Sequence, residues 1–341
     1  MKKVVRVILV MVCVASLLVG CSGNASTGKE GDGGKLVVRI GTQEMPNDEG
    51  IAKALDYFKE EIDADIELIK FDSGKDVNVA LASGSIDFGL EGSCPATLAI
   101  AQDLGVELIW IHEVLGSVES FVARKESGIT KVEDLVGKKV ATPFASTAHF
   151  SLLKALELAG INASDVTLLD MQPDKIYAAW VNGDIDAAYI WQPTLANLEN
   201  AVELATSEEL ANAGYMTSNV EVVRKEFADK NPEIVKAYIR ALNKATKLYQ
   251  EDEEAAVKTM ATALKLSEED AKFQMSGSLW MNAKEQITDQ YLGTSGKKGA
   301  VVQNLYDTAV FLKDQNSIKE VPDRKVFESA VNPSYAEAAA N

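Results

Sequence analysis

Hydroxyl side chains that stand directly before helical stretches are the residues of this chain best placed to do chemistry. Ser146 and Thr147 follow a strand-like run and open a helix predicted over residues 148–159. Ser93 and Cys94 stand in the same position ahead of a second helical stretch. A helix start carries unpaired N–H groups and the positive end of the helix dipole, so hydroxyl groups there suit an oxyanion. Either start alone is typical of an ordinary N-cap, whereas two in matching positions favour a shared anion site.

A repeated pattern indicates that these two helix starts belong to two similar lobes. Residues 83–87 and 182–186 each end a helix-like stretch in glycine and run into Ile-Asp, with the two glycines 99 residues apart. Each copy continues through a β-prone run into a polar turn closed by proline, Pro95 in the first and Pro193 in the second. Glycine suits the left-handed position after a helix, and proline suits the first helical turn. Both turns are therefore expected at strand ends, facing a ligand.

Alternating strand-like and helical stretches surround these positions and predict an α/β fold. In the first part of the chain the strand-like runs are 36–40, 66–71, 86–90 and 106–111. The rhythm restarts near residue 121, with runs at 139–142, 166–171 and 187–190. After about residue 222 the pattern is helical, and we expect these helices to pack on the first lobe. The prediction is two lobes, each a mostly parallel sheet flanked by helices, with a ligand cleft between them.

The N-terminal sequence predicts the cellular location of the protein. Lys2, Lys3 and Arg6 precede an apolar run at 7–19, which ends next to Cys21. The run is too short for a typical membrane span of about 20 apolar residues, which makes a transmembrane helix the weaker interpretation. It resembles a bacterial lipoprotein signal, in which the cysteine becomes the first mature residue and carries the lipid. We therefore predict a signal peptide over 1–20, a lipid on Cys21 and a flexible, glycine-rich tether over 21–34.

Composition limits the partners of the processed chain. Removing the three basic residues of the signal segment takes the formal charge from −17 to −20, which argues against nucleic-acid and acidic-membrane partners. An apolar share of 47% is ample for a core in each lobe. The signal holds Cys13 and the lipid takes Cys21, which leaves Cys94 without a partner and excludes a disulfide framework.

Signatures of catalysis, metal binding and cofactor binding are absent from the sequence. His112 and Glu113 lack a second histidine four residues on, so the zinc-protease pattern does not occur. His149 has no serine or cysteine nucleophile placed beside it, and packing or a hydrogen bond to ligand is the better interpretation. No phosphate-loop or nucleophile-elbow motif occurs either. We expect no enzyme activity, no metal and no cofactor.

Several motifs together resemble the taurine and alkanesulfonate-binding proteins of ABC importers, in the NMT1/THI5-like group. They lie at 71–74, 80–84, 92–95, 143–150, 179–180, 183–186 and 189–193. The resemblance covers most of residues 36–330 and implies a two-lobed periplasmic-binding-protein fold of type II, with the first lobe completed by the C-terminal part of the chain. It places the crossovers near Glu119 and Val222. The implied lobes are 35–118 with 222–335, and 119–221.

The resemblance also implies a binding site. In the family a sulfonate is held by two hydroxyl-bearing helix starts, which correspond here to Ser93 with Cys94 and to Ser146 with Thr147. An aromatic side chain of the second lobe, matched by Trp191, walls the pocket. The neighbouring Gln192 and the helix residue His149 complete the candidate ligand contacts in that lobe.

Two departures from the family pattern bear on the ligand. Cys94 replaces a serine and is a weaker hydrogen-bond donor, although its backbone N–H can still serve. Asn219 stands where the taurine-type pattern has an aspartate suited to pairing with an amine. Glu44, Glu91 and Glu113 would compensate if they face the cleft, and otherwise are solvated surface groups. The expected ligand is a small sulfonate, with or without an amine, or a similar anion or zwitterion.

The predicted function is that of a monomeric, lipid-tethered receptor outside the cell that delivers this ligand to an ABC permease. The same fold includes receptors for thiamine-precursor pyrimidines and for nitrate-like anions, which remain the alternatives. A more remote alternative is a pyrimidine-synthase-like enzyme with His149 or Cys94 as its reactive group. Contact with both lobes would let the ligand stabilise a closed form that the permease recognises.

Overall fold

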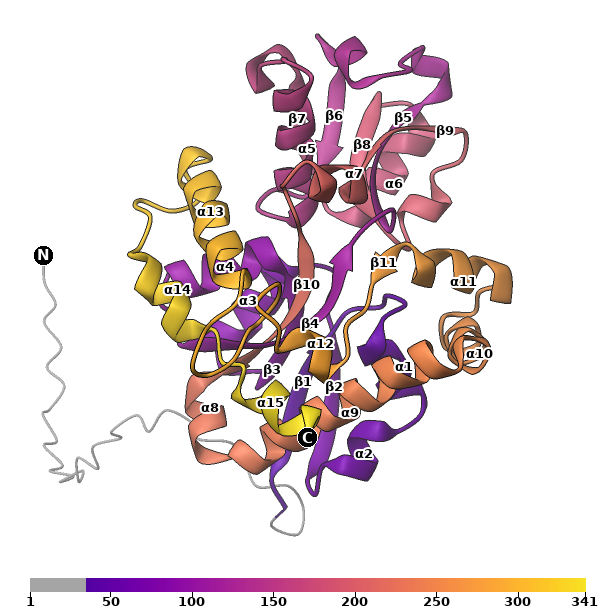
Figure 1. Ribbon diagram of the computed structural model, residues 1–341. Helices are drawn as coiled ribbons and strands as arrows, with labels where there is room; N and C mark the ends of the chain where they lie inside the picture. The colour runs from indigo at the N-terminus through magenta and orange to yellow at the C-terminus, as the bar shows by residue number, and fades with distance from the viewer. Residues whose placement is uncertain (1–34) are drawn as a thin grey trace, which may run out of the picture.

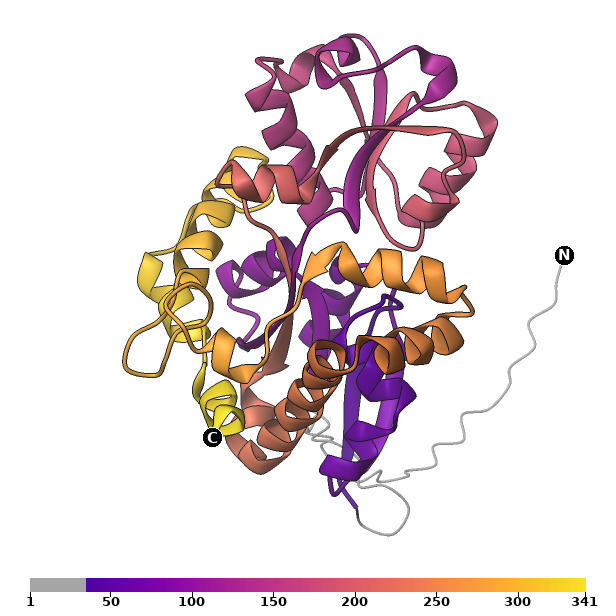
Figure 2. The same cartoon turned by 45° about the vertical axis from the view of Figure 1, so that its right-hand side comes forward.

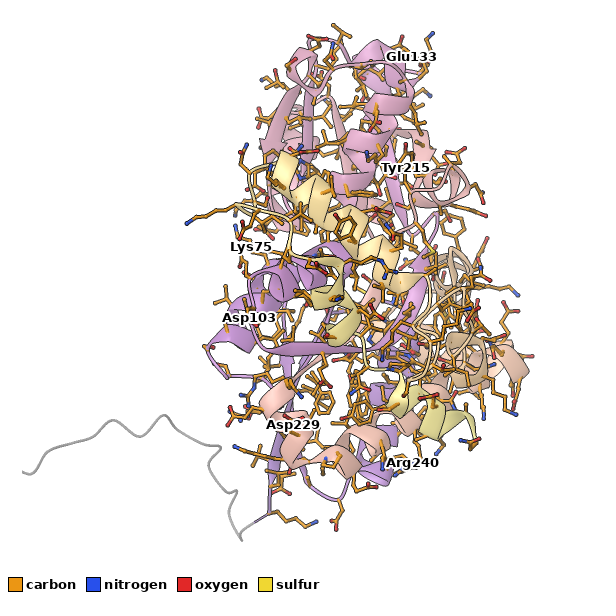
Figure 3. All side chains as sticks on the ribbon, turned by 60° about the vertical axis from the view of Figure 1, so that its left-hand side comes forward. Lys75, Asp103, Glu133, Tyr215, Asp229 and Arg240 are labelled. Atoms are coloured by element: carbon orange, nitrogen blue, oxygen red, sulfur yellow. The ribbon has the colours of Figure 1, made fainter. Side chains whose placement is uncertain are left out.

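The computed structural model describes residues 35–341, so the predicted signal peptide (1–20), the lipid site at Cys21 and the tether (21–34) lie outside the described residues. The described chain forms two lobes joined by two connecting segments (Figures 1 and 2). Glu133 lies near one end of the elongated molecule, and Asp229 and Arg240 near the other (Figure 3). In this described part, no helix has both the length and the apolar character needed to span a membrane.

The larger lobe, called here the six-stranded lobe, is built on one mixed sheet. Its strands lie in the order β11-β4-β10-β3-β1-β2. Their bounds are β1 (Val37–Thr42), β2 (Asp65–Lys70), β3 (Phe88–Gly92), β4 (Val106–Leu115), β10 (Ser218–Arg224) and β11 (Ser278–Leu279). Strand β1 pairs in parallel with β2 and β3, whereas β10 pairs antiparallel with β3 and β4, and β11 antiparallel with β4.

Helices from both ends of the chain cover this sheet. They are α1 (Asp48–Ala54), α2 (Tyr57–Glu61), α3 (Gly74–Ala82), α4 (Ser93–Ala101), α8 (Lys225–Lys230), α9 (Pro232–Glu251), α10 (Glu253–Leu264), α11 (Glu268–Ser276), α12 (Ala283–Gln286), α13 (Val301–Asp314), α14 (Arg324–Ala330) and α15 (Ser334–Ala340). Helix α13 packs on α4 and α9 packs on α1 and α2, so the C-terminal helices complete the first lobe as expected (Figure 1).

The smaller lobe, called here the five-stranded lobe, has the strand order β7-β6-β8-β5-β9. Its strands are β5 (Glu119–Arg124), β6 (Lys139–Thr142), β7 (Thr167–Asp170), β8 (Ala187–Trp191) and β9 (Ala201–Thr206). Its α-helices are α5 (Thr147–Leu158), α6 (Pro173–Asn182) and α7 (Ser207–Asn212), and short 3₁₀ turns are η1 (Lys125–Ser127), η2 (Val132–Leu135), η3 (Ala163–Asp165) and η4 (Leu195–Asn197). Strand β6 pairs in parallel with β7 and β8, whereas β5 pairs antiparallel with β8 and β9.

The two-lobed α/β fold with mostly parallel sheets is confirmed, although both sheets are mixed. Strands β1, β2, β3 and β4 share one direction in the six-stranded sheet, as do β6, β7, β8 and β9 in the five-stranded sheet. The opposed strands are β11 and the two that carry the chain between the lobes, β5 and β10. Strand β5 enters the five-stranded sheet from the cleft side, and β10 enters the six-stranded sheet from the same side, so each runs against its parallel neighbours. The chain returns to the six-stranded sheet at Ser218, four residues before the boundary expected at Val222.

The repeated Gly-x-Ile-Asp pattern corresponds to one structural device used in both sheets. Gly84 and Gly183 have φ values of 69° and 77°, the left-handed conformation that glycine adopts after a helix. The aspartate that follows makes the same kind of hydrogen bond to a neighbouring strand in each sheet. Asp87 accepts a hydrogen bond from the Arg39 backbone N–H, and Asp186 accepts one from the Lys139 backbone N–H.

The core of the six-stranded lobe is dominated by aromatic packing against α9. The apolar residues of this long helix recur at three-to-four spacing, which places Val235, Tyr238 and Leu242 on one buried face. The Tyr238 ring stacks on Phe88 of β3 at 4.3 Å and on Phe58 of α2 at 4.9 Å between ring centroids. Full burial of such side chains contributes about 1.5–3 kcal/mol each, which fixes the sheet that carries the cleft residues.

Asp87 is expected to contribute more to stability than its counterpart Asp186. Its buried carboxylate accepts from the backbone and guanidinium of Arg39 and from the guanidinium of Arg224. Asp87→Ala should therefore lower the free energy of unfolding by about 3–5 kcal/mol in urea denaturation, because it removes the buried carboxylate that both guanidinium groups share and leaves them only carbonyl and surface partners. Asp186→Ala removes one hydrogen bond to Lys139 and should cost about 1 kcal/mol. Equal losses for the two variants would contradict this assignment.

Candidate functional site

A cavity lies between the lobes, at the ends of strands from both sheets. Strand ends and the helix starts that follow them are where ligands bind in open α/β sheets. The lining residues are Gln43, Met45, Pro46, Gly74, Gly92, Pro95, Glu113, Leu115, Val118, Glu119, Ser146, Thr147, Trp191, Gln192, Asn219 and Ser278.

The starts of helices α4 and α5 meet at this cavity. Gly92 is the N-cap of α4, and Ser146 is the N-cap of α5. A methyl group placed on Gly92 would lie 2.9 Å from Cγ2 of Thr147, so the absence of a side chain at Gly92 permits the close approach. The predicted juxtaposition of two helix starts, one from each lobe, is present in the structure. Unpaired amides and two positive dipole ends therefore point into one space.

The hydroxyl groups at these starts are mostly engaged within the protein. Ser146 Oγ donates to the Pro143 carbonyl at 2.5 Å and accepts from the His149 amide at 3.1 Å, which makes it a true N-cap. Ser93 Oγ is buried and accepts from the Ser218 amide at 3.4 Å, and it does not line the cavity. Thr147 does line the cavity. Backbone amides therefore remain the main donors available to an anion.

Glu119 stands at the first crossover and organises the start of α5. Its Oε2 accepts from Thr147 Oγ1 at 2.5 Å, and its Oε1 accepts from Ser207 Oγ at 2.9 Å. Burial raises the pKa of Glu119 to about 7, against the lowering effect of the hydroxyls of Thr147, Ser207 and Ser151. The sequence marked Glu119 only as a crossover position. Its spacing of 100 residues from Asn219, the second residue of the other crossing strand β10, is the signal that could have identified it.

Asn219 lies in the cavity wall beside a second buried carboxylate. Its Nδ2 donates to Glu113 Oε1 at 2.5 Å and approaches Met45 Sδ at 3.2 Å. Burial raises the pKa of Glu113 to about 7, while His112 lowers it and Asp48 raises it further. Of the glutamates expected to compensate for Asn219, Glu113 alone lines this cavity.

The other two glutamates lie elsewhere. Glu91 is fully buried against Gly74, does not line the cavity, and has its pKa raised well above the usual range by burial. Glu44 lines an adjoining space at the cleft mouth, where it forms an ion pair with Lys70 at 2.7 Å. Its pKa is lowered by that lysine. Strand alternation turns Glu91 away from the cleft, and the partner Lys70 holds Glu44 outside it.

His149 and Cys94 are placed by packing. The His149 ring stacks on Phe144 at 4.3 Å and meets Phe311 edge-on at 5.7 Å, and burial lowers its pKa to about 4. The free thiol of Cys94 is buried in the core of the six-stranded lobe, and burial raises its pKa. Neither residue lines the cavity. The packing of both side chains leaves only the backbone N–H of Cys94, at the start of α4, as the contact with ligand that was expected for that residue.

The far wall of the cavity comes from the end of β8. Trp191 and Gln192 both line it, at the positions expected from the sequence. Gln192 is buried, and its Oε1 accepts from the Ala196 amide at 3.1 Å, which leaves its side-chain NH₂ group without a recorded acceptor among the described residues. Within residues 35–341, no three His, Cys, Asp or Glu side chains are grouped so as to hold a metal ion.

Comparisons with known proteins match this architecture. The family model described as NMT1/THI5 like matches residues 50–256. The taurine-binding periplasmic protein of Escherichia coli is 37% identical over 80% of this chain and 84% of that protein. A putative aliphatic sulfonates-binding protein of Bacillus subtilis is 29% identical over 70% of this chain and 72% of that protein. The alkanesulfonate-binding protein SsuA of Xanthomonas axonopodis pv. citri, solved with MOPS bound, shares the fold with a TM-score of 0.70 at 24% identity, over 90% of this chain and 99% of that one.

The raised pKa of Glu119 predicts a pH dependence of stability. An unfolded glutamate titrates near 4.3, so between about pH 4.5 and 7 the folded protein holds a proton that the unfolded chain has lost. Stability therefore falls as pH rises through this window, by up to about 3 kcal/mol from this group. Glu119→Gln should remove that share, so urea unfolding at pH 5 and pH 8 should show a smaller loss for the variant. Glu67→Gln, on the exposed side of β2, is the control, and parallel pH profiles for wild type and Glu119→Gln would contradict the assignment.

Proposed function

The chain belongs to the NMT1/THI5-like family, and on this premise we propose that it is the substrate-binding component of an ABC importer whose ligand is a small organic sulfonate. The observation that carries the proposal is the meeting of the α4 and α5 starts in one interlobe cavity. The similarity to taurine-binding and aliphatic sulfonates-binding proteins supports the same ligand class.

The anionic group would be held by helix-start amides rather than by a cation. The first residues of α4 are Ser93 and Cys94, and the first residues of α5 are Thr147 and Ala148. Their N–H groups have no acceptor within their own helices and lie at the positive dipole ends. Proline at position 95 removes the next donor of α4, so the amides of Ser93 and Cys94 carry that half of the site. Trp191 closes the opposite wall with an apolar surface for the carbon part of the ligand.

A ligand that contacts both lobes can change how the lobes are arranged. Strand β5 begins at Glu119 after one connection, and β10 begins at Ser218 after the other, so the lobes can move about these two segments. A ligand that touches both helix starts favours the closed arrangement by its extra affinity for that arrangement. The permease would recognise this closed form.

The cavity argues against the alternative ligands of the same fold. A pyrimidine receptor would be expected to stack its ligand between aromatic rings, whereas Trp191 is the one aromatic among the lining residues of the described chain. An enzymatic role has no support, because His149 and Cys94 do not line the cavity and the similar curated proteins named above are binding proteins.

The cellular setting follows from the same assignment. The E. coli relative is periplasmic, and we propose an extracytoplasmic location for this chain. The lipid anchor on Cys21 and a monomeric state belong to this proposal. Mass spectrometry of the membrane-extracted protein would test the anchor, with a diacylglycerol-modified N-terminal peptide beginning at Cys21 as the expected result.

Calorimetry with purified protein tests the ligand class. Taurine and ethanesulfonate are the sulfonate probes, and nitrate and a hydroxymethylpyrimidine are the competing ones. We expect heat of binding from at least one sulfonate and none from nitrate or the pyrimidine. Binding of nitrate or pyrimidine alone would contradict the proposed ligand.

A methyl group at Gly92 should weaken ligand binding without unfolding the protein. The backbone of Gly92, at φ −70° and ψ 158°, accepts alanine, but its methyl would press on Thr147 of the other lobe. Overpacking of this kind costs about 1–3 kcal/mol, which corresponds to an affinity loss of about 5- to 150-fold if the closed form bears it. Gly296→Ala, where the added methyl meets nothing closer than 3.9 Å, is the matched control in the same calorimetric titration. Unchanged affinity in Gly92→Ala would show that the two helix starts do not close on the ligand.

A further inference from the structure

The charges that line the cavity are unusual for an anion site. Among the lining residues of the described chain are two carboxylates, Glu113 and Glu119, and no lysine, arginine or histidine. A simple anion would enter a space whose ionisable groups are all acidic. Helix-start amides can hold the anion, but nothing in the lining balances the carboxylates.

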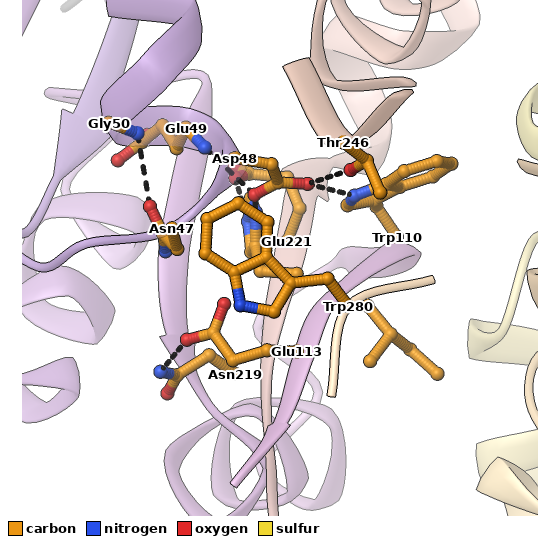
Figure 4. A network of polar contacts seen from close by, with 12 residues as sticks. Asn47, Asp48, Glu49, Gly50, Trp110, Glu113, Asn219, Glu221, Thr246 and Trp280 are labelled. Atoms are coloured by element: carbon orange, nitrogen blue, oxygen red, sulfur yellow. Dashed lines mark hydrogen bonds and ion pairs between the residues drawn. The ribbon is translucent and has the colours of Figure 1, made fainter. Parts of the chain in front are cut away.

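The two carboxylates differ in how many of their oxygens accept hydrogen bonds. Both oxygens of Glu119 accept hydroxyl hydrogen bonds from Thr147 and Ser207. In Glu113 one oxygen accepts from Asn219, whereas Oε2 is buried and forms no hydrogen bond of normal geometry within residues 35–341 (Figure 4). The side-chain amide of Asn47 lies near enough to lower the pKa of Glu113, but its Nδ2 also lacks a partner of normal geometry among these residues. Glu113 is 3% exposed, and a buried carboxylate oxygen without a donor is costly. A donor supplied by the ligand would remove that cost.

Register places this oxygen close to the anion end of the site. Asn219 of β10 stands opposite Gly92 on one side and opposite Glu113 on the other. Directly opposed residues of neighbouring strands share a face, and strands lie about 4.8 Å apart. Gly92, the N-cap of α4, and Glu113 are therefore two strands apart, about 10 Å between backbones, and the glutamate side chain spans part of that gap. One small molecule can reach both.

The groups behind Glu113 hold it in place. On α1, Asp48 accepts from the Trp110 indole (Figure 4). It also lies against His112, which in turn contacts Glu221. The network ties β4, β10 and α1 together, and its one ionisable base, His112, is occupied by Asp48 and Glu221. Burial raises the pKa of Glu113 to about 7. A cation bound beside it therefore has to lower that pKa only slightly for the carboxylate to be ionised at neutral pH.

The geometry points to a cation subsite at Glu113, oriented by Asn219, which makes the receptor selective for zwitterionic aminosulfonates with a short linker over simple sulfonates. The ligand ammonium donates to Glu113 Oε2 while its sulfonate meets the starts of α4 and α5. This inference rests on the proposed function, because the anion end of the ligand is taken from it. The taurine-type pattern has an aspartate where this chain has Asn219. The inference gives the role of that negative charge to Glu113 on the neighbouring strand β4.

Calorimetry with two ligands of nearly equal shape tests the subsite. Taurine carries the ammonium and ethanesulfonate lacks it. A charge-assisted hydrogen bond of about 1.5–3 kcal/mol gives wild-type protein an expected preference for taurine of about 10- to 150-fold. Glu113→Gln should remove most of that preference, which is measured as the ratio of the two affinities in the same protein. The shorter acid in Glu113→Asp should retain part of the preference.

Glu44→Gln is the matched control, because Glu44 lies at the cleft mouth outside this cavity and is paired with Lys70. Its preference for taurine should equal that of wild type. An equal loss of preference in Glu44→Gln would assign the effect to the general acidic field and overturn the subsite. Equal wild-type affinities for the two ligands would overturn it too, even if Glu113→Gln failed to fold. If neither sulfonate bound to wild type while nitrate or a pyrimidine did, the proposed function itself would fail.

Discussion

The two strands that cross between the lobes are the constraint on which the rest of the structure depends. Each sheet contains one strand that follows directly on a connection between the lobes, β5 in the five-stranded lobe and β10 in the six-stranded lobe. The last residue of each of these strands bonds to the aspartate of the repeated pattern. The Arg124 amide donates to the Asp186 carbonyl, and the Arg224 amide donates to the Asp87 carbonyl. The cleft ends of these strands therefore occupy equivalent positions. Glu119, the first residue of β5, and Asn219, the second residue of β10, both line the cavity there.

This arrangement is what lets the proposed site recognise an anion without a lysine, arginine or histidine in its lining. Helix-start amides are fixed by the fold and keep their orientation when the ligand arrives, so their dipoles need no reorganisation. The protein uses its hydroxyls to fix the helices, as Ser146 does for α5 and Ser93 does for β10. The carboxylates then distinguish ligands that carry an ammonium group beside the anionic group from ligands that do not. Affinity and selectivity thus come from different elements of the cleft.

The sequence predicted the elements better than it predicted the contacts. The strand-to-helix turn at Ser146 and Thr147 carries a local signal, because capping residues and a helical pattern lie next to each other. The placement of His149 depends on Phe311, which is 162 residues away, and no local pattern reports it. The sheets were expected to be mostly parallel because alternating strands and helices indicate parallel pairing. Most strands follow that rule, but β5 and β10 run against their neighbours because they enter each sheet from the cleft side.

The lobes also touch away from the cavity, and that contact limits how they can move. Phe311 of α13, in the six-stranded lobe, packs edge-on against Phe150 of α5 at 5.0 Å between ring centroids. Phe150 belongs to the core of the six-stranded lobe although its helix belongs to the other. Exposing such side chains costs about 1.5–3 kcal/mol each, which exceeds what most weak ligand contacts supply. This contact therefore favours the arrangement in which the starts of α4 and α5 stand together, and a ligand that touches both starts adds to the same preference.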